Sequence, residues 1–138
     1  MPAKDRYHNN CKQALIKDGW TITHDPFNLR VGRKDLFIDL GAEKFLGAQK
    51  GERKIVVEIK SFIGLSEVND FENAVGQYIV YQSSLKRLEV DRTLYLALRQ
   101  KTFQDLFSEE LVQNVLADKL LKLLVFEDKQ ESIVRWIN

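Results

Sequence analysis

The sequence predicts an α/β sandwich with a mixed sheet, folded as a single domain over residues 1–138. Three observations favour this class. The chain is long enough to bury a core, and 44% of its residues are hydrophobic. Segments with helical spacing of apolar residues alternate with short segments rich in β-branched residues. There is no repeat, low-complexity tract or obvious linker that would divide the chain.

The first half of the chain is expected to form a helix followed by three strands. Apolar residues recur at helical spacing over residues 4–18, and Gly19 is a suitable C-terminal cap. Residues 20–23 form a short strand that the turn signal His24-Asp25-Pro26 ends. A longer strand is expected over residues 36–49, bent at Gly41 or Gly47. A turn at residues 50–52 then leads into an antiparallel strand over residues 54–62.

The second half is expected to supply one long helix and a closing hairpin. Ser66 is a good N-cap, and a helical stripe continues to about residue 87. A strand over residues 92–98 and a helix over residues 101–117, broken near Ser108, come next. The last two strands, 120–126 and 132–137, pair around the turn at residues 127–130. The expected order is therefore α-β-β-β-α-β followed by α-β-β.

Charge is balanced overall but uneven along the chain. There are 21 Lys and Arg against 20 Asp and Glu, yet residues 1–65 carry a net +4 and residues 66–138 a net −3. A basic half is compatible with a polyanionic substrate. Other chemistries lack their motifs: no Cys/His cluster for zinc, no serine with His and acid at motif spacing, and no phosphate-binding glycine loop.

The sequence predicts a cytoplasmic protein. Cys11 is the only cysteine, so no intrachain disulfide can form, which fits a reducing compartment. The first ten residues contain no apolar signal-peptide core, and the longest apolar runs are far too short to span a membrane.

The segment from Asp39 to Lys60 contains the residues that suggest chemistry. Side chains alternate along a strand, so Glu58 and Lys60 share one face while Ile55, Val57 and Ile59 take the other. A strand this apolar is expected to be buried on both faces, where an unpaired charge is costly. Metal coordination with proton-transfer chemistry is one reason to place two charges there.

A hairpin centred on Gly51 would place Glu58 near Glu43 and Lys44, and Asp39 beside Lys60. Two carboxylates in this neighbourhood could hold Mg²⁺ or Mn²⁺, with Lys60 stabilising the charge that develops on a phosphate. The alternative is an exposed strand face on which these charges only make cross-strand pairs.

Asp39 followed 19 residues later by Glu58-x-Lys60 resembles the site of the PD-(D/E)XK nuclease superfamily. Gln77-x-x-x-Tyr81 is similar to the Q-x-x-x-Y motif of its RecB-like branch, and four residues place both side chains on one helical face. The resemblance implies a restriction-endonuclease-like sandwich with an αβββαβ core and a C-terminal β-hairpin. It also implies a metal held by Asp39, Glu58 and the carbonyl of Ile59, a catalytic Lys60, and support from Gln77 and Tyr81.

Some positions around this motif stay open. Ile38 stands where many superfamily members have proline. Asp35 and Glu43 are alternative carboxylates, and Glu43 is an additional candidate metal ligand. Asp5 and His8 on the first helix are further candidates, because superfamily members often present an acid from that helix. The simpler interpretation of Asp5 and His8 is a helix-start acid and a solvated histidine.

The whole chain also resembles the XisH family, the fdxN-element excision controlling factors. The resemblance rests on segments spread from end to end: MPAKDRYHN, ALIKDGWTITHDPF, KDLFIDLGAEK, VVEIKSF, AVGQYIVY, KLLVFED and IVRWI. It implies an accessory factor that controls site-specific excision of a DNA element, acting with a recombinase and a XisI-like companion factor. The nuclease-like site would act on DNA as a Mg²⁺-dependent endonuclease. The alternative is a catalytically inactive nuclease-fold protein that binds DNA, the recombinase or the companion as a regulator. The oligomeric state, including a homo-oligomer, stays open.

Overall fold

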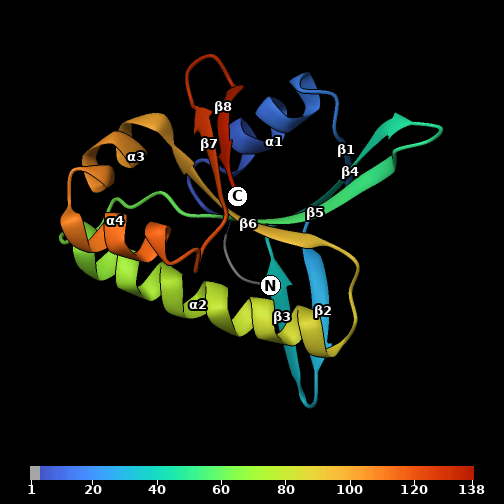
Figure 1. Ribbon diagram of the computed structural model, residues 1–138, viewed down its shortest axis with the longest axis horizontal. Coiled ribbons are helices and arrows are strands. Elements are labelled where there is room, and N and C mark those ends of the chain that lie inside the picture. The colour runs from blue at the N-terminus through green and yellow to red at the C-terminus, as the bar shows by residue number, and fades with distance from the viewer. Residues whose placement is uncertain (1–3) are drawn as a thin grey trace.

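The computed structural model describes residues 4–138, which form a curled mixed sheet with helices on both faces (Figure 1). The elements of this range, in chain order, are α1 (His8–Lys17), β1 (Thr21–His24), β2 (Phe27–Val31), β3 (Lys34–Ile38), β4 (Leu40–Gly47), β5 (Gly51–Ile59), α2 (Glu67–Arg87), β6 (Thr93–Arg99), α3 (Gln100–Phe107), α4 (Glu110–Ala117), β7 (Leu123–Glu127) and β8 (Ser132–Ile137).

The main sheet has the strand order β1-β4-β5-β6-β7-β8. Strands β5, β6 and β7 run parallel to one another, and the β1–β4, β4–β5 and β7–β8 pairs are antiparallel. The expected mixed sheet and closing hairpin are therefore confirmed. The break near Ser108 is confirmed too, because α3 ends at Phe107 and α4 begins at Glu110.

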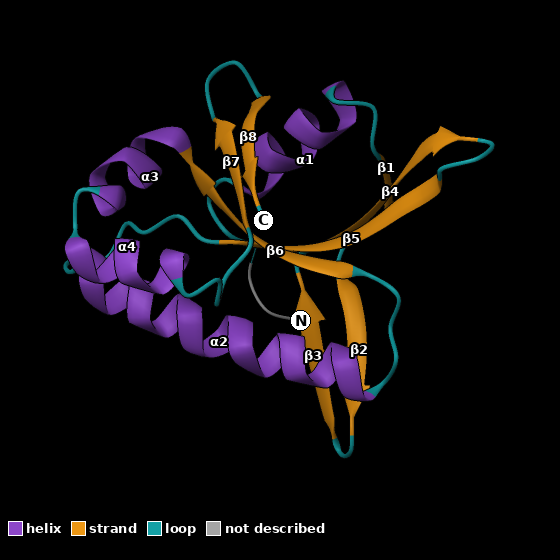
Figure 2. Ribbon diagram, viewed as in Figure 1, coloured by secondary structure: helices purple, strands orange, loops and turns teal. Residues whose placement is uncertain are grey.

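Each face of the sheet carries its own core, as alternation along β5 requires. Ile55, Val57 and Ile59 pack with Cys11 and Leu15 of α1. Val56 points to the other face, into the core that α2, α3 and α4 cover. Figure 2 shows α1 on one side of the sheet and the long α2 on the other. Glu58 has the same parity as Val56 and therefore faces α2.

The predicted long strand over residues 36–49 is wrong in one respect that matters for the site. The structure divides it into β3 and β4, and β3 pairs with β2 in a separate two-stranded sheet. This β2–β3 hairpin, which the sequence analysis missed, projects from the main sheet (Figure 1). The break falls at Asp39 and not at a glycine, because Ile38 and Leu40 are buried in different cores.

The register predicted for the β4–β5 hairpin is also wrong. The turn lies between Gly47 and Gly51, which both have positive φ, so it is centred two residues earlier than expected. Glu43 consequently pairs with Lys54, and Leu40 pairs with Val57. This shift carries Glu43 away from Glu58 and brings Glu58 across from Asp39.

Candidate functional site

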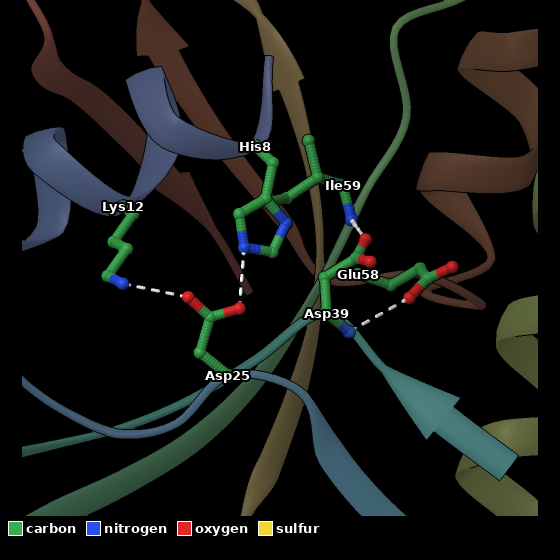
Figure 3. A network of polar contacts seen from close by, with 6 residues as sticks. All are labelled: His8, Lys12, Asp25, Asp39, Glu58 and Ile59. Atoms are coloured by element: carbon green, nitrogen blue, oxygen red, sulfur yellow. Dashed lines mark hydrogen bonds and ion pairs between the residues drawn. The ribbon is translucent and has the colours of Figure 1, made fainter. Parts of the chain in front are cut away.

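Two carboxylates meet where β3 turns into β4 beside the end of β5. Asp39 lies at the junction, and Glu58 is the next-to-last residue of β5. The backbone N–H of Ile59 donates to Asp39 Oδ2 at 2.7 Å, and the N–H of Asp39 donates to Glu58 Oε1 at 3.3 Å (Figure 3). Each carboxylate is thus fixed by the backbone of the other's strand.

Lys60 completes the charged group. Its Nζ lies 3.4 Å from Glu58 Oε2, and its backbone N–H donates to the carbonyl of Ala97, which fastens this segment to β6. Glu58 is almost entirely buried, whereas the Lys60 side chain is about one-third exposed. An ammonium group therefore stands between a buried carboxylate and solvent, as the strand alternation predicts.

Burial governs the electrostatics of the two acids. Burial first, and the negative charge of Asp39 second, raise the pKa of Glu58 to about 8 against the opposing effect of Lys60. Burial also raises the pKa of Asp39, which the N–H of Ile59 and the nearby His8 partly oppose. Lys60 alone therefore does not offset the negative charge of the two carboxylates.

Helix α2 adds the two residues of the Q-x-x-x-Y motif. Gln77 Nε2 donates to the Tyr81 hydroxyl at 2.8 Å, as expected for residues one turn apart. Burial raises the pKa of Tyr81 to about 12, and the charges of Glu58 and Asp39 act in the same direction. Because the hydroxyl accepts from Gln77, its own proton remains available to an acceptor in the site.

All of these residues line one cavity of about 380 Å³. Its walls come from β3, the end of β5 and one face of α2, and its lining residues are Asp5, Asp35, Leu36, Phe37, Asp39, Glu58, Ile59, Lys60, Gln77 and Tyr81. Of the open candidates, Asp5 and Asp35 belong to this lining. Asp35 also pairs with Arg30 at 3.0 Å on the β2–β3 hairpin.

Glu43 does not join this site. Its Oε1 lies 2.9 Å from Arg92 Nη2, and the same guanidinium donates to the carbonyl of Ile55. The open candidate Glu43 therefore lies outside the lining of this cavity, because its expected position assumed the incorrect hairpin register.

His8 forms a network behind the carboxylates. Its Nε2 lies 2.7 Å from Asp25 Oδ1, and Lys12 Nζ donates to Asp25 Oδ2 at 2.8 Å (Figure 3). His8 is only 3% exposed, so the interpretation of a solvated histidine is wrong. Asp25, which the turn signal at residues 24–26 marks only as a turn residue, therefore belongs to a partly buried network. No sequence signal marks a pairing across 17 residues, which depends on how α1 packs on the sheet.

The residues at the site partly fit a divalent cation. Two carboxylates, each with one oxygen free of backbone N–H donors, offer the hard oxygen ligands that Mg²⁺ prefers, and a cation would offset their mutual repulsion. No group of three Asp, Glu, His or Cys side chains suited to a metal occurs within residues 4–138. Ile59 lines the cavity beside both acids, which makes its carbonyl a candidate third ligand.

Comparisons with known proteins place the whole chain beside two solved structures. Curated proteins give no match. Two crystal structures each share 38% identity with the chain at a TM-score of 0.86. One is an XisH family protein from Nostoc punctiforme PCC 73102, and 97% of this chain covers 100% of it. The other is a fdxN element excision controlling factor protein from Anabaena variabilis, for which the coverage is 98% and 100%.

Two further findings concern the whole chain. Within residues 4–138, no helix is both long and apolar enough to cross a membrane. The family model described as XisH protein matches residues 1–134. Since that match takes in nearly the entire sequence, the chain belongs to the XisH family.

Proposed function

We propose that this protein is an accessory factor that controls excision of a DNA element and that its cleft hydrolyses a phosphodiester bond in DNA. The observation that carries the proposal is the meeting of half-buried Asp39, buried Glu58 and Lys60 in the lining of one cavity. The first part also rests on the Anabaena variabilis structure, which is described as an excision controlling factor. We further assign the fold to the restriction-endonuclease-like class and the site to the PD-(D/E)XK superfamily, on the motif and the carboxylate arrangement.

Each residue has a defined role in this proposal. Asp39, Glu58 and the carbonyl of Ile59 would hold Mg²⁺ or Mn²⁺, which polarises a phosphate oxygen and offsets charge on the transferring group. Lys60 is placed to stabilise negative charge that develops on the phosphate, because its ammonium group reaches solvent beside Glu58. Tyr81, held by Gln77, directs a hydroxyl proton toward the same cavity.

A regulator without turnover is the second candidate, and one observation favours it. Asp39 and Glu58 each accept a backbone N–H from the other's strand, so the pair also fastens the β3–β4 junction to β5. A pair kept only for this purpose would need no metal. The protein would then bind DNA, the recombinase or a XisI-like companion factor through other surfaces.

A nicking assay on supercoiled DNA with Mg²⁺ or Mn²⁺ separates the two candidates. We expect Lys60→Ala to lower the nicking rate by about 10²- to 10³-fold, the usual cost of removing one group that stabilises a transition-state charge. Glu58→Ala should abolish the nicking that depends on added metal. Lys54→Ala is the matched control, since Lys54 lies on the same strand outside the cavity, with its Nζ 3.8 Å from Glu52 Oε1.

Equal nicking by the wild type, Lys60→Ala and Glu58→Ala would identify a contaminant and overturn the catalytic proposal. Excision in cells provides the second readout. If folded Glu58→Ala and Lys60→Ala variants support normal excision and still capture the companion factor, the regulator is correct. If excision is lost while capture persists, the site itself is required.

A further inference from the structure

A second cavity of about 480 Å³ adjoins the candidate site. It shares Asp5, Lys60 and Gln77 with the first cavity, so the two cavities meet at these residues. Its other walls are the loop that follows β5 and the first turns of α2, with the lining residues Ser61, Phe62, Ile63, Gly64, Asp70, Asn73 and Ala74. Its volume falls within the range of about 300–1,000 Å³ that is usual for small-molecule sites.

The loop that forms this cavity is held in place along its length. The N–H of Ser61 donates to Asp5 Oδ2 at 3.0 Å, and Arg99 Nη2 donates to the Ser61 carbonyl at 3.2 Å. Farther along, the N–H of Gly64 donates to Asp70 Oδ2 at 3.0 Å. A Cβ at Gly64 would lie 2.6 Å from that same oxygen, so a larger residue there would displace the Asp70 carboxylate. The cavity is therefore preformed.

The backbone of Phe62 is strained, with φ of 54° in a residue that has a bulky side chain. Such strain persists only where the surroundings impose it, and it concentrates at binding sites. Here it places a half-buried aromatic side chain in the wall beside Lys60. Ile63 stands next to it and is 59% exposed, which leaves apolar surface at the rim.

The charged residues in the lining indicate which kind of ligand this cavity can bind. Asp5 and Asp70 are both in the lining, and Lys60 is the one cation among the lining residues. A second phosphate would meet two carboxylates, so the cavity disfavours it. A neutral group with N–H donors and a flat apolar face fits better, because carboxylate oxygens accept, the Asn73 amide both donates and accepts, and Phe62 offers a ring.

We propose that this cavity binds one unpaired nucleobase of a DNA strand whose neighbouring phosphate lies at Lys60. The inference rests on the proposed function, since it takes DNA as the ligand, and it narrows the substrate to DNA with a nucleotide outside the base stack. Extruding a base costs least where it is already unpaired. The protein accordingly prefers single strands, bulges or distorted duplexes over regular duplex.

Equilibrium binding in EDTA tests this proposal without cleavage. The probes are a fluorescently labelled duplex, the same duplex with one bulged nucleotide, and the labelled single strand. We expect the wild type to bind the bulged duplex at least about fivefold more tightly than the regular one, since one base stack or hydrogen bond contributes this much or more. Asn73→Ala should remove most of that preference. Gln82→Ala is the matched control, being another exposed amide on α2 that lies outside this cavity.

A second variant guards against misinterpretation. Gly64→Ala displaces Asp70 and should also abolish the preference for the bulged duplex. If Gly64→Ala does not fold, Asn73→Ala still tests the subsite, because Asn73 is exposed on a helix. Equal affinity for the three probes, or an unchanged preference in Asn73→Ala, would overturn the subsite and leave the nicking proposal standing. A preference without any nicking supports the subsite and overturns only catalysis. If no probe binds, both proposals are wrong.

Discussion

Replacing Glu58 with glutamine is expected to stabilise the protein in the absence of metal. Glu58 is buried beside Asp39, and its pKa is raised to about 8 by burial first and by that neighbouring charge second. A glutamine has the same shape, and its amide oxygen can still accept the N–H of Asp39. The substitution therefore removes the free-energy cost of burying an ionisable group and leaves the packing in place.

The size of the effect follows from the two pKa values. At pH 7 an unfolded glutamate with its ordinary pKa of 4.5 is ionised, whereas the native side chain holds a proton. At 1.36 kcal/mol per pKa unit, taking up that proton at pH 7 costs about 3 kcal/mol. This pKa already contains the opposing effect of Lys60, so nothing more is subtracted for that contact. The expected gain is about 3 kcal/mol, or a melting temperature higher by about 9–15 °C.

The pH dependence has a definite sign. Because the native pKa lies above the unfolded one, the wild type binds more protons when folded between pH 4.5 and pH 8. Its stability should fall through this window as pH rises, while that of Glu58→Gln lacks this fall. The difference between the two proteins therefore grows from pH 5 to pH 8 and is constant above it.

Urea denaturation in EDTA at pH 5, 7 and 9 measures this difference. Glu52→Gln is the control, because Glu52 lies on the same strand with an exposed side chain, and its free energy of unfolding should change by less than about 0.5 kcal/mol. Adding Mg²⁺ should stabilise the wild type alone if the ion binds only the native site. If Glu58→Gln is no more stable than the wild type at pH 9, the carboxylate is already compensated and the reasoning fails.

Three further outcomes are expected. Glu43→Gln should lower the free energy of unfolding, measured by urea denaturation, by about 1–3 kcal/mol, because it deprives the buried Arg92 of its anion. It should leave metal-dependent nicking unchanged, and a loss of nicking would return Glu43 to the site. Tyr81→Phe should cost about 1 kcal/mol, the value of the hydrogen bond it accepts, and equal stability would show that bond to be weak. A double change of Arg33 and Lys34 to alanine should reduce the salt dependence of DNA binding, measured as the slope of log K against log salt, by about 2; an unchanged slope would mean that the β2–β3 tip does not touch phosphates.

Local sequence patterns were sufficient for the parts of the fold that depend on neighbours in the chain. Alternation along β5 predicted which face Glu58 and Lys60 share, and helical spacing predicted that Gln77 lies one turn from Tyr81. The N-cap at Ser66 is another local signal, and its hydroxyl does accept the N–H of Asn69. Each of these relations involves residues at most four positions apart.

Relations between distant residues could not be predicted in the same way. The register of the β4–β5 hairpin depended on which glycine closes the turn, and an error of two residues at the turn misplaced Glu43. The β2–β3 hairpin was missed because its strands are short and stand beside a Pro-containing turn. The pairing of His8 with Asp25 arises only when α1 packs against the sheet.

A nearly neutral protein that binds DNA must both attract the phosphate backbone and select a nucleotide. In this protein the charges place these two tasks in different parts of the structure. The cavities at the site contain Asp5, Asp35 and Asp70, which weaken phosphate binding there. Arg33 and Lys34 lie at the exposed tip of the hairpin that leads into Asp39, and within residues 4–138 neither makes an ion pair. At about 3.4 Å per residue, the five residues from Lys34 to Asp39 span about 17 Å, close to five base pairs of duplex. Affinity for the backbone can thus come from the hairpin tip, while the acidic site selects the nucleotide that it admits.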